Sequence, residues 1–302
     1  MAAASPPLEA LVAAELAEPV EPRVSAMAAA IAAFYPGAAR AVLFYGSCLR
    51  EKQLEGLMLD FYLIVSDYRA AYGKSWMAPA NRLIPPNVFP FEHEGLVAKY
   101  AVLSEADFLR LNGPETLSVS VWARFAQPSR LVWRADDEAA RRAVAAVARA
   151  APTLLDAAWP LFAGSDPLDL WRHGFQLTYS AELRSERKGR AVSVVDADPE
   201  RYRRFSEPAL AAAGIALAAP VPPEARRRAL RRWARMRRAG KALTMIRLAK
   251  ASGTYAGGID YLAWKINRHA GTAIEIKPWQ RRWPLLAAVT LLPKLLRRGA
   301  IR

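Results

Sequence analysis

Short apolar runs separated by turn residues dominate the first 135 residues of the chain. The Ala-rich segment Ser25–Phe34 predicts a helix, because the stop signals Pro36 and Gly37 follow it. Ala41–Tyr45 and Leu59–Val65 are predicted to be strands. The second of these runs is apolar almost without interruption, which is typical of a strand covered on both faces. We therefore expect an α/β fold, with a mixed sheet flanked by helices.

Further strands and one long connection follow. Val97–Leu103 alternates and predicts a third strand, and Ser104 is expected to cap a helix whose first turn is acidic. Leu131–Trp133 is a candidate for another strand. Trp76–Glu94 is rich in Pro and aromatic residues and predicts an irregular connection. A loop of that length usually has a function.

Beyond Asp136 the pattern of apolar residues changes and predicts a series of consecutive helices. The predicted helices are Asp137–Ala150, Leu168–Ser185, Pro199–Ala213 and Glu224–Ala251. Ala211–Pro223, which is rich in Ala and Pro, predicts a linker before the last of them. We expect three regions, 1–135, 136–260 and 261–302, and no internal repeat.

The composition indicates a folded protein with an anionic partner. Of the 302 residues, 53% are hydrophobic and nine are Trp, which is enough for a sizeable core. The formal net charge is +15, with a pI near 10.3. This balance predicts binding to nucleic acid, a nucleotide or an acidic lipid surface.

Several kinds of site are disfavoured by the residue types present. The three histidines, His93, His173 and His269, show no i, i+4 spacing, which argues against a zinc site or a Ser-His-Asp triad. Cys48 is the only cysteine, so no intrachain disulfide is expected and a reducing compartment is favoured. The first 22 residues lack the basic start and apolar core of a signal peptide, which predicts an intracellular protein.

Basic residues gather in the last third of the chain. Glu224–Lys250 carries eleven Lys and Arg after its one acid. A solvated face around a core stripe of Leu230, Trp233, Leu243 and Ile246 explains the apolar positions but not the one-sided charge. Lipid headgroups or nucleic acid phosphates would both satisfy that charge. In Trp279–Arg302, Trp and cations flank an apolar middle, which is typical of an interfacial membrane helix; a terminal core helix is the alternative.

The candidate chemistry lies in Ala41–Asp67. A tight Gly46-Ser47 turn after a strand offers backbone N–H groups and a hydroxyl to a triphosphate, and Asp60 on the next strand can hold a divalent cation. This is the layout of a nucleotidyltransferase site. The usual second acid, two residues on and on the same face, is replaced by Tyr62. The alternative is a purely structural strand, turn and helix with a buried Asp, which would have the same sequence pattern.

Several blocks along the chain occur in the order expected of one family. They are Phe44-Tyr45-Gly46-Ser47, Met58-Leu59-Asp60-Phe61 with Val65-Ser66-Asp67, Lys99-Tyr100-Ala101-Val102-Leu103-Ser104, Arg124-Phe125-Ala126-Gln127-Pro128 and Leu177-Thr178-Tyr179-Ser180-Ala181-Glu182-Leu183-Arg184. Together they resemble the mitochondrial-type phosphatidate cytidylyltransferases, the translocator assembly and maintenance family of CDP-diacylglycerol synthases, and their bacterial relatives. In that family Gly-Asp is usual where Ala181-Glu182 stands here. The blocks cover more than half the chain, and jointly they are more specific than any one alone.

The resemblance implies a set of site residues. Asp60 and Lys99 would be catalytic, with Asp60 also binding Mg²⁺. The residues expected to bind the nucleotide are Tyr45, Gly46, Ser47 and Arg124. Those expected to bind the phosphate of the second substrate are Glu182, Arg184, Lys188 and Arg190.

The same resemblance implies a fold and an activity. The fold would be a nucleotidyltransferase domain, a mainly helical, winged-helix-like domain and an amphipathic C-terminal helix on the membrane. CTP and phosphatidate would give CDP-diacylglycerol and pyrophosphate, on the cytoplasmic, inner face of a membrane and without a nucleic acid partner. Two alternatives stay open: a non-catalytic basic protein of this fold that binds RNA or anionic lipid, and an active nucleotidyltransferase with another acceptor.

Overall fold

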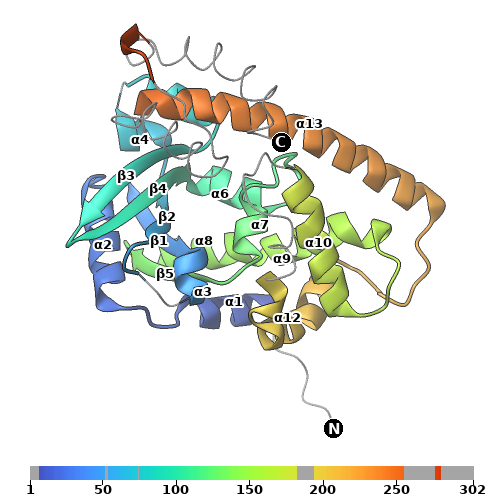
Figure 1. The fold of residues 1–302 in the computed structure, drawn as a ribbon. Coiled ribbons are helices and arrows are strands. Elements are labelled where there is room, and N and C mark those ends of the chain that lie inside the picture. The colour runs from blue at the N-terminus through green and yellow to red at the C-terminus, as the bar shows by residue number, and fades with distance from the viewer. Residues whose placement is uncertain (1–6, 52–53, 74, 182–193, 255–275, 280–302) are drawn as a thin grey trace.

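The computed structural model describes residues 7–51, 54–73, 75–181, 194–254 and 276–279 (Figure 1). Five strands form one mixed sheet in the order β3-β4-β2-β1-β5. The strands are β1 (Ala39–Tyr45), β2 (Met58–Val65), β3 (Asn87–His93), β4 (Leu96–Ser104) and β5 (Ser129–Arg134). β2 and β4 run parallel, and the other neighbours are antiparallel. The predicted α/β class with a mixed sheet and flanking helices is confirmed.

Helices cover both faces of this sheet and fill the second half of the chain. They are α1 (Leu8–Leu16), α2 (Pro22–Ala33), α3 (Ser47–Glu51), α4 (Tyr68–Tyr72), α5 (Met77–Leu83), α6 (Glu105–Asn112), α7 (Trp122–Phe125), α8 (Asp137–Ala148), α9 (Ala150–Ala158), η1 (Trp159–Leu161), α10 (Pro167–Ala181), α12 (Pro199–Ala212) and α13 (Pro223–Thr254). The predicted cap holds, because Ser104 Oγ accepts a hydrogen bond of 3.2 Å from Asp107 N at the start of α6. Within the described residues, no helix combines the length and the apolar character needed to cross a bilayer.

The predicted irregular connection Trp76–Glu94 is wrong, because it contains α5 and β3. Proline misled the interpretation. Pro79 lies in the first turn of α5, where a missing N–H breaks no helical hydrogen bond. Pro90 lies in β3, an edge strand, where proline is tolerated. The sheet therefore has one more strand than the sequence pattern predicted.

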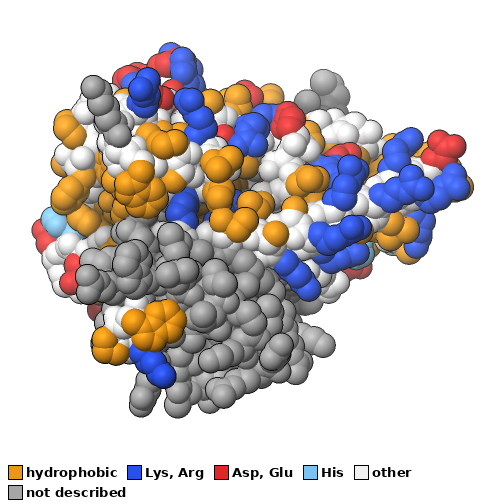
Figure 2. Space-filling model, turned by 90° about the horizontal axis from the view of Figure 1, so that it is seen from above, with side chains coloured by type: hydrophobic (Ala, Val, Ile, Leu, Met, Phe, Trp, Pro, Cys, Tyr) orange, Lys and Arg blue, Asp and Glu red, His pale blue; other side chains and the backbone are white. Residues whose placement is uncertain are grey.

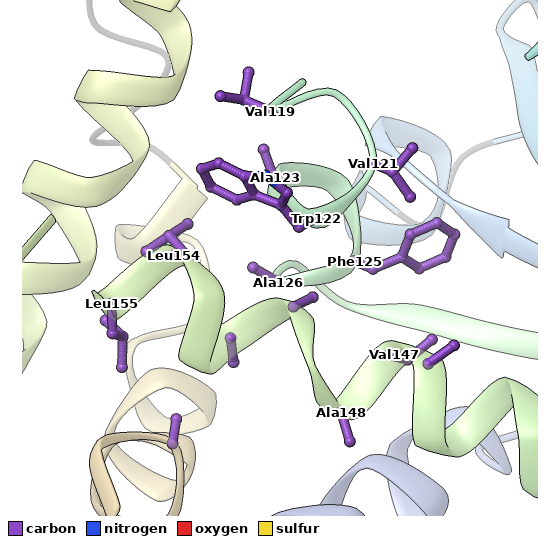
Figure 3. Packing of buried hydrophobic residues seen from close by; sticks show 14 of the residues in the cluster. Val119, Val121, Trp122, Ala123, Phe125, Ala126, Val147, Ala148, Leu154 and Leu155 are labelled. Carbon is purple, nitrogen blue, oxygen red and sulfur yellow. The ribbon is translucent and has the colours of Figure 1, made fainter. Parts of the chain in front are cut away.

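Alternate residues of each strand face two separate clusters. Phe44, Phe61 and Val102 pack on the side of α2, α4 and α5. Leu43 and Leu103 face the larger cluster, which includes residues of α1 and of α6 to α13. Figure 3 shows a part of it, in which residues around α7 pack against α8 and α9. Residues on both sides of position 135 share this cluster, while the division into domains there stays a prediction.

A buried ion pair ties α12 to α1 within the larger cluster. Arg201 and Glu15 are paired through both Nε and Nη2, with only 4% and 5% of their side chains exposed. Arg201 Nη1 also donates to the carbonyl oxygen of Ala126, at 3.1 Å. Three segments distant in sequence are held together at this point.

Helix α13 lies across the top of the molecule in Figure 1, over α10 and the β3 edge. Its Trp233 is buried, stacks edge-on against Trp122 and donates from Nε1 to the Ala157 carbonyl oxygen at 2.7 Å. The predicted core stripe is only partly right, because Leu230 and Ile246 are exposed. Trp233 does pack inward, as predicted, and its neighbours on the inward face are Met236 and Gly240.

Candidate active site

Three side chains form a row across the middle of the sheet. Tyr45 on β1 lies opposite Asp60 on β2, and Asp60 lies beside Lys99 on β4. Side chains alternate along a strand, so all three lie on the face of the larger cluster, the same face as Leu43, Tyr62 and Ala101, which are two residues away from them along the strands. Lys99 Nζ is 3.0 Å from Asp60 Oδ1. The structure thus brings together the two residues that the sequence analysis expects to be catalytic.

The Gly46-Ser47 turn closes directly against this row. Gly46 has φ +99°, a backbone conformation that favours glycine. A Cβ at this position would come within 2.9 Å of Asp60 Oδ2. Ser47 begins α3 immediately afterwards and is half-buried. Glycine is therefore required here both for the turn and for its approach to the carboxylate.

Tyr62 occupies the place of a second acid because the position lies inside an aromatic cluster. Its side chain is 3% exposed. The ring centroids of Tyr62 and Tyr45 are 5.3 Å apart, and those of Tyr62 and Phe125 are 5.2 Å apart. A carboxylate at this point would lose these ring contacts and would be partly desolvated among the aromatic side chains. Asp60 is thus the one carboxylate of the row.

A pocket of about 170 Å³ opens beside the row. Tyr45, Tyr62 and Val88 line it together with four cationic side chains. The cations are Lys99 of β4, Arg124 of α7, and Arg247 and Lys250 of α13. Of the described residues that line the pocket, none is acidic. Such a cavity is suited to an anionic ligand, in particular one with phosphate groups.

Arg124 connects the row to the segment before α7. Its guanidinium is hydrogen-bonded to the Tyr45 hydroxyl and donates to the Ser120 carbonyl oxygen. Burial, together with the nearby Asp60 carboxylate, raises the pKa of Tyr45 well above its ordinary value. Tyr45 therefore stays a neutral phenol next to the pocket at physiological pH.

Arg247 and Lys250 are pocket residues that the sequence analysis did not single out. Arg247 donates from Nε to the Pro85 carbonyl oxygen at 2.8 Å and from Nη1 to Ser120 Oγ at 3.1 Å. Lys250 Nζ donates to the carbonyl oxygen of Ile84. Burial and the charge of Arg247 lower the pKa of Lys250 to about 7. A signal was present: both cations continue, at helical spacing, the inward face that begins with Trp233.

The predicted site residues fall into three groups. Tyr45, Lys99 and Arg124 line the pocket. Gly46, Ser47 and Asp60 are not part of the pocket lining. Asp60 contacts the pocket residue Lys99, and Gly46 packs against Asp60. Glu182, Arg184, Lys188 and Arg190 lie outside the described residues, as does the predicted C-terminal helix Trp279–Arg302 apart from Trp279 itself, which is exposed.

Asp60 is the candidate ligand for a magnesium ion. Its Oδ1 is buried and lies 3.0 Å from Lys99 Nζ, so the Lys99 ammonium offsets the charge of the carboxylate. No group of three His, Cys, Asp or Glu side chains is close enough to form a metal cage among the described residues. Mg²⁺ commonly uses only one or two carboxylates and takes its remaining ligands from substrate phosphates and water. Asp60 fits that mode of binding, with the ligand supplying the other oxygens.

Comparisons with known proteins add little. No protein-family model matches the chain, and no curated protein matches it. Among solved structures, it is similar to a nucleotidyltransferase-like protein from Exiguobacterium sibiricum 255-15, with a TM-score of 0.29 and 10% identity over 91% of this chain and 92% of that one. A likeness this low carries no argument. The α/β class stands on the sheet and helices described above, and the resemblance to phosphatidate cytidylyltransferases stays a prediction from the sequence.

Proposed function

We propose that the protein is a nucleotidyltransferase of the phosphatidate cytidylyltransferase kind, which converts CTP and phosphatidate to CDP-diacylglycerol and pyrophosphate. The observation that carries the proposal is the row of Tyr45, Asp60 and Lys99, against which Gly46 packs at the edge of a cationic pocket. A Gly-Ser turn after one strand and a carboxylate on the next are the parts that phosphoryl transfer from a nucleotide needs.

The charge of the pocket agrees with two phosphate-bearing substrates. CTP and a phosphomonoester together bring several negative charges, which repel each other unless cations separate them. Lys99 pairs with Asp60, against which Gly46 packs, and Arg124 is hydrogen-bonded to Tyr45, the residue before Gly46, so both cations are placed to contact nucleotide phosphates. Fixed cations of this kind stabilise charge that develops in the transition state.

The reaction requires no general base. A phosphate oxygen of phosphatidate would attack the α-phosphorus of CTP, and the bond from that phosphorus to the oxygen bridging the β-phosphorus would break. Pyrophosphate leaves with the electron pair of that bond. Since the second pKa of a phosphomonoester is about 6, the attacking oxygen is already deprotonated at neutral pH. Mg²⁺, when bound, would neutralise phosphate charge at the position of Asp60.

The exposed side of α13 supports contact with an anionic membrane. Figure 2 shows Lys and Arg side chains gathered over the N-terminal half of this helix, at the right of the view. The exposed cations there are Arg226, Arg227, Arg228, Arg231, Arg235 and Arg238. Each cation near an anionic leaflet gains on the order of 1 kcal/mol. This face could hold the protein peripherally on the membrane that contains its lipid substrate.

The proposal is tested by pyrophosphate release from CTP and Mg²⁺ with the purified full chain. We expect release that depends on added phosphatidate, with CDP-diacylglycerol formed in equal amount. Parallel reactions with ATP, GTP or UTP test the cytidine preference. Release that needs another acceptor would instead support a different nucleotidyltransferase.

A second candidate is a non-catalytic protein that binds anionic ligands. The observation in its favour is that Lys99 already pairs with Asp60, the row's one carboxylate, while Tyr62 replaces the second acid. Nucleotide binding without turnover, for every nucleotide and acceptor tried, would support this candidate and contradict the first.

A further inference from the structure

One face of α13 changes character along its length. Trp233 and Met236 are buried, and a Cβ on Gly240 would meet the Ala181 carbonyl oxygen of α10 at 2.1 Å. At the same helical spacing, the face then presents Arg247 and Lys250 to the pocket. The apolar half of the face fixes the helix against the core, and the cationic half forms one wall of the pocket.

The surroundings of Arg247 orient its guanidinium. Nε donates to the Pro85 carbonyl oxygen, Nη1 to Ser120 Oγ at 3.1 Å and Nη2 to Ser118 Oγ at 3.4 Å. Both serines are buried, and their hydroxyl oxygens lie 2.9 Å apart. Ser120 also accepts from Arg124 through its carbonyl, so it connects the two arginines. The side chain is thereby held in place before any ligand arrives, which reduces the entropy lost on binding.

Among the described residues that line the pocket, Lys250 has no acidic neighbour. The charged side chains that line the pocket with it are Arg247 on its own helix, Lys99 of β4 and Arg124 of α7, all of them cations. Burial and the charge of Arg247 already lower its pKa to about 7. An anion between these groups would relieve their mutual repulsion and favour the charged form of Lys250.

Two exposed apolar residues adjoin this cationic wall in sequence. Leu83 is 79% exposed and precedes Ile84, whose carbonyl oxygen binds Lys250. Ile246 is 44% exposed and precedes Arg247. Pro86, between α5 and β3, and Val88 of β3 line the pocket, whereas Leu83 and Ile246 lie outside its lining. A ligand with its phosphate on this wall would meet Pro86 and Val88 inside the pocket, and its apolar part would extend beyond them toward the exposed Leu83 and Ile246 side chains.

We propose that Arg247 and Lys250 form the acceptor subsite, which binds the phosphomonoester of a lipid substrate, with Leu83 and Ile246 in contact with its apolar tail. Lys99, which pairs with Asp60, and Arg124, which is hydrogen-bonded to Tyr45 just before the Gly46 turn, would be left to the nucleotide. This inference rests on the proposed function, because it assigns two phosphate subsites to one pocket.

The test is calorimetric titration of the full chain with three probes: CTP with Mg²⁺, dioctanoyl phosphatidate and glycerol 3-phosphate. Arg247→Gln and Lys250→Met are expected to weaken phosphatidate binding about tenfold to a hundredfold each, because each removes a charged hydrogen-bond partner. CTP affinity should change by less than about threefold, well under the effect of a lost charged hydrogen bond. The matched control is Lys241→Met, at an exposed position on the same helix, which should leave both affinities unchanged.

A second pair of variants tests the proposed contact with the apolar tail. Leu83→Ser and Ile246→Ser change exposed side chains and should weaken dioctanoyl phosphatidate while leaving glycerol 3-phosphate unchanged. Equal losses for CTP and phosphatidate in the α13 variants, or no loss for phosphatidate, would overturn the inference. Absence of CTP binding in the wild type would overturn the proposed function instead. Thermal melts identify any variant that fails to fold. If Arg247→Gln does not fold, the phosphatidate affinity of Lys250→Met, which loses only one hydrogen bond, tests the inference.

Discussion

Gly46 lies so close to Asp60 that a Cβ on the glycine would come within 2.9 Å of the Asp60 Oδ2 atom. The Asp60 carboxylate therefore occupies the space that a side chain at position 46 would need. Asp60 can lie where it does in the proposed nucleotide site only because the turn residue is glycine.

Gly46→Ala should displace the Asp60 side chain and strain the turn, because alanine is disfavoured at φ +99°. We expect a loss of stability of about 1 kcal/mol or more and a loss of most turnover. The control is Gly56→Ala, with φ +73° and no atom within 4 Å of the added Cβ. It carries the backbone strain without the steric contact, so unfolding of both variants and their rates of pyrophosphate release separate the two effects. Equal activity of the two variants would contradict the role assigned to the contact.

Asp60→Asn should abolish turnover and leave the fold intact, because the amide keeps the volume of the carboxylate and removes its charge. We expect pyrophosphate release to fall by about a hundredfold or more, the range found for loss of one electrostatic catalytic group. Asp137→Asn, at an exposed surface pair with Arg134, is the matched control and should have full activity. Activity of Asp60→Asn within a few-fold of the wild type would exclude the carboxylate from the mechanism.

Lys250→Met should stabilise the protein at low pH more than at high pH. The pKa of Lys250 is about 7 in the folded state and near its ordinary value of 10.5 in the unfolded chain. Between these values the unfolded state holds the extra proton, so the wild type gains stability as the pH rises from 7 to 10.5. Below pH 7 both states are protonated and the wild type bears the full cost of the buried charge.

The measurement is the difference in Tm between the variant and the wild type from pH 6 to pH 10. It should be largest near pH 6 and shrink toward pH 10. Lys241→Met, at an exposed position on the same helix, should show a difference that does not vary with pH. A constant difference for Lys250→Met would show that the ammonium is not desolvated.

Arg201→Met should lower the free energy of unfolding by about 3–5 kcal/mol, because it leaves the Glu15 carboxylate buried without its partner. The double variant Glu15→Leu with Arg201→Met should recover much of that loss, since no charge then remains in the core. Arg203→Met breaks an exposed pair with Glu200 and should cost less than about 1 kcal/mol. Denaturant unfolding of the four proteins checks this, and a double variant no more stable than the single one would contradict the explanation.

The sequence predicts the centre of this fold better than its edges. β1, β2 and β4 are central strands, and their apolar runs are long enough to identify them within about two residues. β3 escaped prediction, since Pro90 is compatible with an edge strand but reads locally as a breaker. The local sequence pattern does not show whether a strand lies at the edge of a sheet, so an edge strand that contains proline cannot be told from a loop by that pattern.

The candidate site divides in the same way. Gly46 and Asp60 are close in sequence and were predicted from the turn and the strand, and Lys99 and Arg124 were expected only from the resemblance. Arg247 was missed as a pocket residue because its contact with Ser120 joins positions 127 residues apart. One-sided charge on a helix does not say which cations face solvent and which face the core, and only the packing of α13 separates them.

The separation between Ser120 and Arg247 also sets an order of events during synthesis. At ribosomal rates of about 5–20 residues per second, the 127 residues between them take roughly 6–25 s to appear. For most of that interval all five strands, the Gly46 turn and Asp60 have been translated, while one wall of the pocket has still to follow. The cationic pocket is therefore incomplete until α13 has been translated, and a product that stops before α13 would leave Trp122 without its partner Trp233.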